Sequence, residues 1–213
     1  MAQFFSVHPT HPQPRLIREA AVILRAGGVI AYPTDSSYAL GCQLGDVAAA
    51  KRIRDIRGVD DAHHLTLVCR DLADAGRYTR LDNWQFRIVR QGIPGAYTFL
   101  LPGTREVPRQ LLHPKRRTIG LRVPDHPVVH ALLEELREPI LSSTLILAGE
   151  SAPLNDPEAI RDRLEQAVDL VIDAGPCVAE PTTVVDLAEE PPVVVRQGVG
   201  DLARLGIPPQ ATG

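Results

Sequence analysis

The sequence predicts one α/β domain built on a mixed β-sheet, spanning residues 1–213. Helix and strand patterns alternate along the chain, and no linker, internal repeat or low-complexity stretch divides it. Several predicted strands follow one another without an intervening helix, which favours a sheet of mixed direction over an all-parallel one. Apolar residues make up 44% of the chain and aromatic residues only 4%, so we expect a sizeable and mainly aliphatic core.

The helices are predicted from apolar spacing and from the residues at their ends. Residues 15–26 show helical spacing and stop at Gly27 and Gly28, a common C-terminal signal. Asp82 and Gln85 resemble a capping box, in which each side chain bonds a backbone amide that the helix end leaves free. Asp46 and Asp156 are predicted N-cap residues, and Pro157 follows the latter at the first helical position. The predicted helices cover residues 15–26, 47–57, 71–76, 83–93, 127–136 and 157–166.

The strands are predicted from short apolar runs bounded by turn residues. The run ILSSTLILAG is divided, because Ser142, Ser143 and Thr144 precede an apolar second half. A strand of this composition can serve the core and also present hydroxyl groups to a polar site. The predicted strands cover residues 29–33, 65–69, 97–101, 118–123, 140–149, 168–175, 182–187 and 192–198.

Cysteine usage and hydropathy indicate the compartment. The three cysteines are odd in number and have no CxxC or zinc spacing, which argues against a disulfide framework and suits a reducing environment. The N-terminus has no basic start followed by an apolar stretch, and no run approaches the length of a membrane span. We therefore expect a cytoplasmic protein without a membrane partner.

Charge is unevenly distributed along the chain. The first 125 residues hold 18 Lys and Arg against 11 Asp and Glu, whereas the rest of the chain holds 5 against 15. The segment 104–122 is strongly basic and largely a predicted loop, with Lys115, Arg116 and Arg117 near its centre. Such a segment can bind the phosphates of a nucleotide or of RNA. The other interpretation is a solvated basic loop.

The sequence lacks the signatures of several common enzyme classes. It contains no GxxxxGK[ST], GxGxxG, GxSxG or HExxH motif. His8 and His11 lie in a Pro-rich N-terminal segment and are better interpreted as a surface pair than as metal ligands. His63 and His64 lie in a predicted loop and are discounted in the same way. We therefore predict no metal centre.

Hydroxyl and cationic side chains gather where predicted strands end. The stretch YPTDSSYALG offers Thr34 and further hydroxyls, which can hold a small polar ligand or can bond the backbone of their own turn. Thr118 and Arg122 are four residues apart on one strand and therefore on one face. An arginine at such a position can bind a carboxylate or phosphate through two parallel hydrogen bonds. Thr182 and Arg196 repeat the combination near the C-terminus.

The order of these features resembles the YrdC/YciO superfamily over most of the chain. The segments that carry the resemblance are PTDSSYALG, PGAYTFLL, RVPDHP, ILSSTLILAG, TTVVDL and VVVRQG. The N-terminal FFSVHPTHPQPRLI is most similar to the YciO branch. The resemblance implies a single open, twisted sheet flanked by helices, with a large concave and positively charged surface.

The resemblance also implies an activity. In the YrdC branch this activity is the synthesis of L-threonylcarbamoyladenylate from threonine, bicarbonate and ATP, with release of pyrophosphate. The product serves the threonylcarbamoyl modification of adenosine in tRNA. By this resemblance we expect a nucleotidyltransferase that uses ATP with Mg²⁺ as a substrate, holds no cofactor tightly, and has tRNA or double-stranded RNA as its macromolecular partner.

Residue by residue, the resemblance assigns two groups of binding side chains. Thr34, Arg122 and Thr182 correspond to the threonine-binding residues, with Arg122 on the carboxylate. Thr118 and Arg196 correspond to residues that contact the nucleotide. Each of these roles is an expectation taken from the family.

The catalytic positions of the family match less completely. Arg57 stands where the family has the lysine of a Lys-x-Arg motif, and Thr144 where it has the serine of Ser-x-Asn; both are expected to be catalytic. Val59 replaces the second cation of the first motif, two aspartates follow it, and Ile146 replaces the asparagine of the second. A charged hydrogen bond is worth about 1.5–3 kcal/mol, so these departures predict weaker ATP binding.

Two alternatives to synthesis remain. The chain can be a double-stranded RNA-, tRNA- or nucleotide-binding protein of the same fold that has lost the synthase activity. Its phosphate contacts would then include Lys115, Arg116 and Arg117, and its binding would weaken steeply with salt. The chain can also be an enzyme that acts on a related carbamoyl or adenylate compound.

Overall fold

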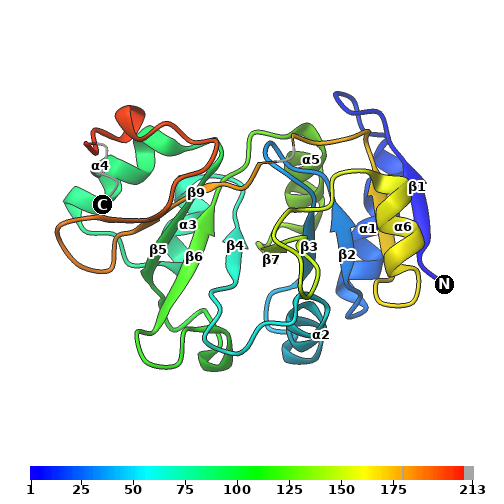
Figure 1. Cartoon of the computed structure of the whole chain (residues 1–213), viewed down its shortest axis with the longest axis horizontal. Coiled ribbons are helices and arrows are strands. Elements are labelled where there is room, and N and C mark those ends of the chain that lie inside the picture. Colours follow the sequence, from blue (N-terminus) through cyan, green and yellow to red (C-terminus); the bar gives the residue numbers. More distant parts are fainter. Residues whose placement is uncertain (179, 209–213) are drawn as a thin grey trace.

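The computed structural model describes residues 1–178 and 180–208 and places ten strands of this part in one sheet (Figure 1). The helices are α1 (Pro14–Arg25), α2 (Val47–Arg57), α3 (Leu72–Tyr78), α4 (Asn83–Gly92), α5 (Pro127–Leu136) and α6 (Pro157–Leu164), with the 3₁₀ turns η1 (Arg109–Leu111) and η2 (Leu202–Leu205). The strands are β1 (Gln3–Ser6), β2 (Ile30–Tyr32), β3 (Ala39–Gln43), β4 (Thr66–Val68), β5 (Tyr97–Pro102), β6 (Thr118–Arg122), β7 (Ile140–Thr144), β8 (Leu170–Asp173), β9 (Thr183–Asp186) and β10 (Val193–Arg196).

The sheet is open and mixed, as the sequence predicts. Its strand order is β1-β8-β2-β3-β7-β4-β6-β5-β9-β10. The pairs β1–β8, β8–β2, β4–β6 and β5–β9 are parallel, and the other neighbours are antiparallel. The central strand β7 therefore runs antiparallel to both of its neighbours, β3 and β4, and it is paired along its whole length with β3.

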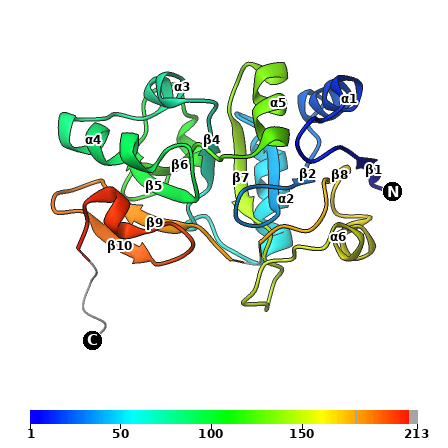
Figure 2. The same ribbon diagram turned by 90° about the horizontal axis from the view of Figure 1, so that it is seen from above.

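Helices cover the two faces of the sheet unequally. On one face, α1 and α5 pack over β2, β7 and β8 through buried side chains such as Leu24, Leu132 and Ile140. The buried side chains of α2, α3, α4 and α6 belong to another core cluster, together with Leu67, Phe99 and Leu141 of the sheet. Figure 2 shows α6 on the side of the molecule opposite α1 and α5. Beyond the end of α2, the face of β4, β5 and β9 away from α3 and α4 opens into a cavity that strand hydroxyls line.

The predicted helices are confirmed, and their capping residues act as the sequence indicates. The carboxylates of Asp46 and Asp156 accept hydrogen bonds from the backbone amides of Ala49 and Ala159, at 2.9 and 2.8 Å. The capping box of Asp82 and Gln85 is formed. These caps satisfy amides that have no partner inside the first turn, which fixes where each helix begins.

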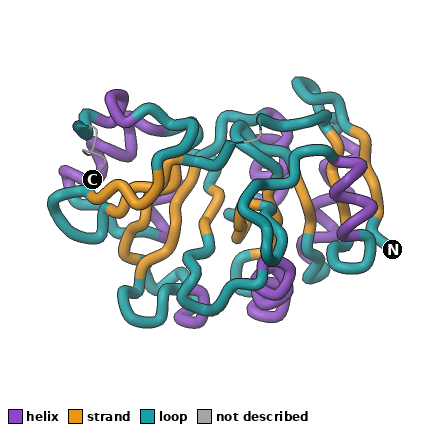
Figure 3. Tube along the Cα trace, in the orientation of Figure 1, coloured by secondary structure: helices purple, strands orange, loops and turns teal. Residues whose placement is uncertain are grey.

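The strand predictions need two corrections. The strands β1 and β3 were not predicted, because β1 is short and β3 follows directly on the turn-rich stretch that ends β2. The strand predicted over 140–149 ends at Thr144. There Ile146 donates its amide to the carbonyl of Thr144, and Leu145 donates to that of Tyr38, so the chain leaves the ladder. Figure 3 shows loop from this point to α6.

Candidate functional site

Polar side chains over the sheet line a cavity of about 460 Å³. Five strand or strand-end hydroxyls face it, and they come from four strands or their ends: Thr66, Thr98, Ser143, Thr144 and Thr182. Residues two apart on a strand share a face, and Thr98 accordingly lines the cavity with Leu100 while Phe99 is buried in the core. The volume lies within the range of small-molecule sites.

The charge of this cavity is entirely positive within the described residues. Arg57, at the end of α2, and Arg196, at the end of β10, are the charged side chains of its lining, and no carboxylate lies among them. His63 and His64 line it as well. A cavity with two guanidinium groups and several hydroxyls suits a ligand that is anionic and rich in hydrogen-bonding groups.

Arg57 is fixed in place by three acceptors. Its Nε donates to the backbone carbonyl of Ile146 at 3.2 Å, and its Nη1 donates to Ser143 Oγ at 2.5 Å and to His63 Nε2 at 3.0 Å. These contacts connect the last residue of α2 to β7 and to the chain that follows it. Because both ends of the connection belong to packed elements, the guanidinium is preorganised toward the cavity.

The two histidines of the cavity are held neutral. Burial, with the charge of Arg57 as the next cause, lowers the pKa of His63 to about 4. Burial, with His113 as the next cause, also lowers the pKa of His64. The ring of His64 stacks on that of His113 with centroids 4.7 Å apart, and its Nε2 lies 2.8 Å from Thr118 Oγ1. Both imidazoles can therefore take part in hydrogen bonds without adding charge.

Arg196 binds the polypeptide on the far side of the cavity. Its Nε donates to the carbonyl of Thr182 at 3.1 Å and its Nη2 to Thr182 Oγ1 at 3.3 Å. The hydroxyl of Thr182 also lies 3.0 Å from that of Thr98. This hydrogen-bonded set joins β10, the start of β9 and β5 into one wall.

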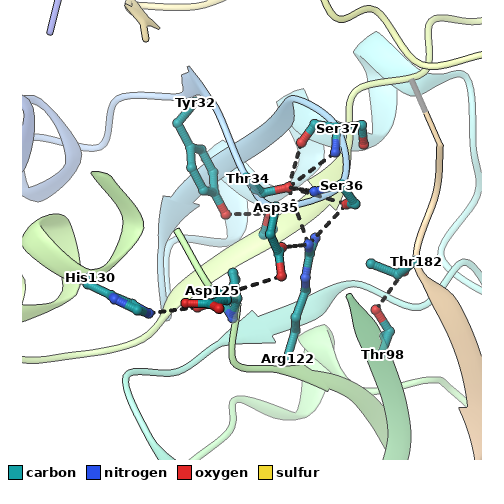
Figure 4. Close-up of polar contacts among 12 residues, drawn as sticks. Tyr32, Thr34, Asp35, Ser36, Ser37, Thr98, Arg122, Asp125, His130 and Thr182 are labelled. Atoms are coloured by element: carbon teal, nitrogen blue, oxygen red, sulfur yellow. Dashed lines mark hydrogen bonds and ion pairs between the residues drawn. The ribbon is translucent and has the colours of Figure 1, made fainter. Parts of the chain in front are cut away.

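A second polar cluster surrounds Arg122 beside this wall. Figure 4 shows the Arg122 guanidinium directed into the turn after β2, with Thr98 and Thr182 close by. Arg122 Nη2 donates to Ser36 Oγ at 3.0 Å, to Thr34 Oγ1 at 3.3 Å and to a carboxylate oxygen of Asp35, with which it forms an ion pair (Figure 4). All three contacts fall on one nitrogen. The Nε of Arg122 is buried and has no hydrogen-bond partner among the described residues.

Three cations therefore share one region of the protein. Burial and then the charge of Arg196 lower the pKa of Arg57 to about 10, and burial and then the charge of Arg122 lower the pKa of Arg196. Each of these guanidinium groups remains protonated at neutral pH. Like charges near one another are unfavourable unless an anion compensates them, and within the described residues only Arg122 has such a partner, Asp35. The arrangement therefore suits a ligand with more than one negative group.

Two features of other protein classes, a membrane-spanning helix and a metal-binding cluster, are absent from the described residues. No helix in this part of the chain is long and apolar enough to cross a membrane. Within the same residues, no three His, Cys, Asp or Glu side chains are grouped so as to hold a metal ion.

Comparison with known proteins places this site in a family. Residues 22–198 match the family Sua5_yciO_yrdC, described as telomere recombination. The chain belongs to the Sua5/YciO/YrdC family. The Escherichia coli (strain K12) protein YciO, which is uncharacterized, is 54% identical over 95% of this chain and 98% of its own length. The crystal structure of E. coli YciO superposes with a TM-score of 0.94, covering 96% of this chain and 100% of that one.

Family members with a described activity are more distant. The threonylcarbamoyl-AMP synthase of Chromohalobacter salexigens is 32% identical over 80% of this chain and 92% of its own length. The Sua5 protein of P. abyssi, solved in complex with L-threonine, is 25% identical with a TM-score of 0.84, covering 92% of this chain and 57% of that chain. The chain is thus similar over most of its length to a YciO protein, to a threonylcarbamoyl-AMP synthase and to a Sua5 protein.

The family site residues that the sequence predicts fall into three places. Arg57, Thr144, Thr182 and Arg196 line the cavity. Thr34 and Arg122 form the adjacent buried cluster, where Thr34 Oγ1 donates to the carbonyl of Ser37 at 2.6 Å. Thr118 does not line the cavity itself. Its hydroxyl lies 2.8 Å from Nε2 of His64, which does line it.

The basic segment is divided in the structure. Arg116 forms an ion pair with Asp186 at 2.5 Å, and the aspartate is only 10% exposed. Its guanidinium is therefore partly neutralised. Arg117 belongs to a different cleft, and Lys115 is exposed in the turn between η1 and β6.

The departures from the family motifs lie outside the cavity lining. Neither Val59 nor Ile146 contributes a side chain to it, and neither do Asp60 and Asp61. Asp61 is 86% exposed and lies 3.6 Å from Arg54. Neither aspartate contributes to the cavity lining, and weaker ATP binding stays a prediction.

Several residues of the site have contacts that were not predicted from the sequence. His63 was discounted as a loop histidine, although it accepts a hydrogen bond from Arg57. Thr66 and Thr98 were not singled out. The signal for Thr98 was present in the strand YTFLL, where a lone hydroxyl alternates with core residues. For His63 no local signal exists, because its role depends on a side chain from α2.

Proposed function

We propose that this protein forms an acyl-type adenylate from an amino acid carbamate and ATP, in the manner of a threonylcarbamoyl-AMP synthase. The observation that carries the proposal is the set of three guanidinium groups, buried at Arg122 and half-buried at Arg57 and Arg196, beside a hydroxyl-lined cavity without a carboxylate. A triphosphate would supply the negative charge that Arg57 and Arg196 lack among the described residues, and an amino acid carboxylate would add a second acceptor for Arg122 beside Asp35.

The relatives support the choice of substrates. The family includes proteins described as threonylcarbamoyl-AMP synthases, one of them human and 30% identical over 75% of this chain. A family member has been solved in complex with L-threonine. We assign threonine to the Arg122 cluster, where the buried Nε of Arg122 has no partner among the described residues and Thr34 and Thr182 lie nearby.

The proposed chemistry needs no covalent intermediate on the protein. The threonine amine adds to carbon dioxide derived from bicarbonate, forms an N–C bond and loses a proton. A carbamate oxygen then attacks the α-phosphorus of ATP; the new O–P bond forms, and the bond from the α-phosphorus to the β-phosphate oxygen breaks. Pyrophosphate leaves with the electron pair. Such a transfer is accelerated mainly by positioning and by neutralising the phosphate charge.

The nucleotide would occupy the main cavity. Arg57 and Arg196 would bind its phosphates, while Thr144 and, through His64, Thr118 would orient it. Magnesium would enter with the nucleotide, held by the phosphate oxygens, because the described lining offers hydroxyls rather than carboxylates as oxygen ligands. The product would serve tRNA modification, which makes a tRNA the proposed final acceptor.

A release assay tests this proposal. Pyrophosphate is measured with threonine, bicarbonate and Mg·ATP, and then with each substrate omitted in turn. We expect release only with all three, at a rate that falls at least about tenfold in Arg122→Ala, since one charged hydrogen bond is lost. Arg87→Ala, at an exposed position of α4, is the matched control. Release no faster than that of Arg122→Ala, with an active family synthase run alongside, would overturn the proposal.

The second candidate is binding of a nucleotide or RNA in the same cavity without synthesis. The same cationic lining supports it, because phosphate binding alone would also relieve the crowding of Arg57 and Arg196. Protection against thermal unfolding by ATP, without pyrophosphate release, would favour this candidate over the first. Such protection should increase with the ratio of free ATP to its Kd.

A further inference from the structure

The strand β10, at the edge of the sheet beside β9 (Figure 2), has an irregularity where it borders the cavity. It pairs antiparallel with β9, and Val194 lies opposite Val185. The next pair does not follow in register, because Arg196 lies opposite Val184. One residue, Val195, therefore has no partner of its own on β9, and it is the extra residue of a β-bulge.

The bulge decides which side chains of β10 face the cavity. Residues directly opposite each other on antiparallel strands have their side chains on one face. Val184 lines the cavity, whereas its neighbours Thr183 and Val185 are fully buried on the other face. In a regular ladder Arg196 would lie opposite Thr183 and face away from the cavity. With the bulge, both Val195 and Arg196 line the cavity, although consecutive residues of a regular strand point to opposite faces.

Val195 extends an apolar part of the cavity lining. Leu100, Val184 and Val195 lie on three neighbouring strands, β5, β9 and β10, and all three line the cavity. The hydroxyls of Thr98 and Thr182, on the same half of the sheet, lie 3.0 Å apart and bond each other. The lining at this end therefore includes an apolar surface, and Val195 remains 57% exposed at its border.

The other end of the cavity is polar. Arg57, Ser143 and Thr144 line it from the end of α2 and from β7. In the strand order, β4 and β6 separate β7 from β5, so this polar end and the apolar surface are on different parts of the sheet. A ligand that matches both ends has an anionic part joined to a flat and weakly polar part. A nucleotide has this chemistry, because its phosphates and its base are at opposite ends of the molecule.

We infer, resting on the function proposed above, that Val195 is a specificity-determining residue that contacts the base of the nucleotide. With the phosphates at Arg57, the base lies over Leu100, Val184 and Val195. The exposed methyl groups of Val195 lose contact with water when the base covers them, which favours binding of the base but not of the phosphates. The bulge supplies this contact without turning Arg196 away from the cavity, as bulges beside functional sites do when they redirect a side chain.

Two variants and a matched control test this inference. Val195→Thr replaces a methyl group by a hydroxyl of similar size and keeps a β-branched side chain. Deletion of Val195 removes the bulge, places Arg196 directly after Val194, and leaves the arginine opposite Val184 in a regular ladder. Val193→Thr is the control, because Val193 lies on the same strand and is 50% exposed but lines a different cleft. Urea unfolding of all three variants checks that they fold.

Calorimetric titration with ATP and with inorganic triphosphate separates the base from the phosphates. Val195→Thr and the deletion should each weaken ATP binding by about three- to tenfold, the effect of losing about one buried methyl contact. Triphosphate has no base, so its affinity should stay at the wild-type value in both. Val193→Thr should bind both ligands as the wild type does.

Several outcomes would overturn the inference. Equal weakening of ATP and triphosphate would mean that Val195 acts only through the cations. Weaker binding of threonine, with ATP unchanged, would assign the apolar surface to the amino acid. No change in either variant, or no ATP binding by the wild type, would leave the bulge as a device that protects a free sheet edge from pairing. The readout is binding alone, so a protein that binds ATP but releases no pyrophosphate would contradict the proposed synthesis and not this inference.

Discussion

Arg57 and His63 share a hydrogen bond of 3.0 Å between guanidinium Nη1 and imidazole Nε2. A guanidinium can only donate, so Nε2 must accept and the ring must carry its proton on Nδ1. The same bond explains why the pKa of His63 lies near 4: the ring is buried, and a proton on Nε2 would meet the charge of Arg57. His63 is thus a neutral acceptor that holds a cavity cation in position.

This bond makes folding stability depend on pH. In the unfolded chain His63 takes up a proton near pH 6.5, whereas in the folded protein it does so only near pH 4. Between these values the unfolded state binds more protons, so the free energy of unfolding should decrease as the pH falls, by about 2 kcal/mol for this residue. Urea unfolding of wild type and His63→Gln between about pH 4.5 and 7.5 measures this decrease in the free energy of unfolding.

Glutamine keeps an acceptor for Arg57 but does not titrate. The difference in unfolding free energy between the two proteins should therefore shrink as the pH falls. The matched control is His11→Gln, at an exposed position of the N-terminal segment, for which we expect no such trend. A constant difference for His63→Gln across the range would contradict the assigned tautomer and charge.

The contacts of Arg122 predict a selective effect on threonine. Only Nη2 is used by Thr34, Asp35 and Ser36, so Nε remains for a ligand carboxylate. In Arg122→Lys the charge persists but the planar group is lost, and in Arg122→Ala both are lost. We expect the KM for threonine to rise about ten- to a hundredfold in both variants, from the value of a charged hydrogen bond.

Steady-state pyrophosphate release at varied threonine and at varied ATP provides the measurement. The KM for ATP should change much less, because Arg57 and Arg196 line the nucleotide cavity. If the KM for ATP rose more than that for threonine, the assignment of Arg122 to the amino acid would be wrong. Arg87→Lys again serves as the unaffected control on α4.

Much of the fold followed from local signals in the sequence. The caps at Asp46, Asp82 and Asp156 are determined within a few residues, and each acts as predicted. The end of β7 is not a local property. Leu145 and Ile146 are as β-prone as their neighbours, but β3 supplies a pairing partner only as far as Thr144, through Ala39.

The site was predictable where it depends on strand periodicity and not where it depends on distant contacts. Arg57 was found through its motif position, whereas its acceptors, Ser143 and His63, depend on how α2 meets β7. The importance given to Ile146 rested on its side chain. In the structure its backbone carbonyl makes the contact with Arg57. Every residue has a backbone carbonyl, so the residue type at position 146 does not indicate this contact.

That carbonyl contact predicts the result of restoring the family motif. In Val59→Arg/Ile146→Asn neither changed side chain lies in the cavity lining, and the carbonyl at position 146 is retained. We expect the rate of pyrophosphate release to change by less than about threefold, a barrier change below about 0.7 kcal/mol. A gain of tenfold or more would mean that these side chains reach the nucleotide and that the family motif is directly catalytic here.

The packing around two glycines, Gly41 in β3 and Gly76 in α3, predicts that substitution by alanine changes the free energy of unfolding in opposite directions. A Cβ at Gly41 would lie 2.7 Å from Tyr32 Cε1 and 2.8 Å from Ile140 Cγ2, in a fully packed part of the sheet. Gly41→Ala should therefore lower the free energy of unfolding by about 1–3 kcal/mol. At Gly76, within α3, a Cβ meets no atom within 4 Å, so Gly76→Ala should raise it by about 0.5–1 kcal/mol.

Urea unfolding of the two variants, at constant pH, compares them directly. The displacement at Gly41 would also be felt by the hydroxyl of Tyr32, which donates to Ser142 Oγ at 2.8 Å on the strand that presents Ser143 to Arg57. We therefore expect Gly41→Ala, and not Gly76→Ala, to slow pyrophosphate release as well. Equal unfolding free energies for the two variants would show that β3 can shift to accept a methyl group, and would contradict the close packing between β2 and β7.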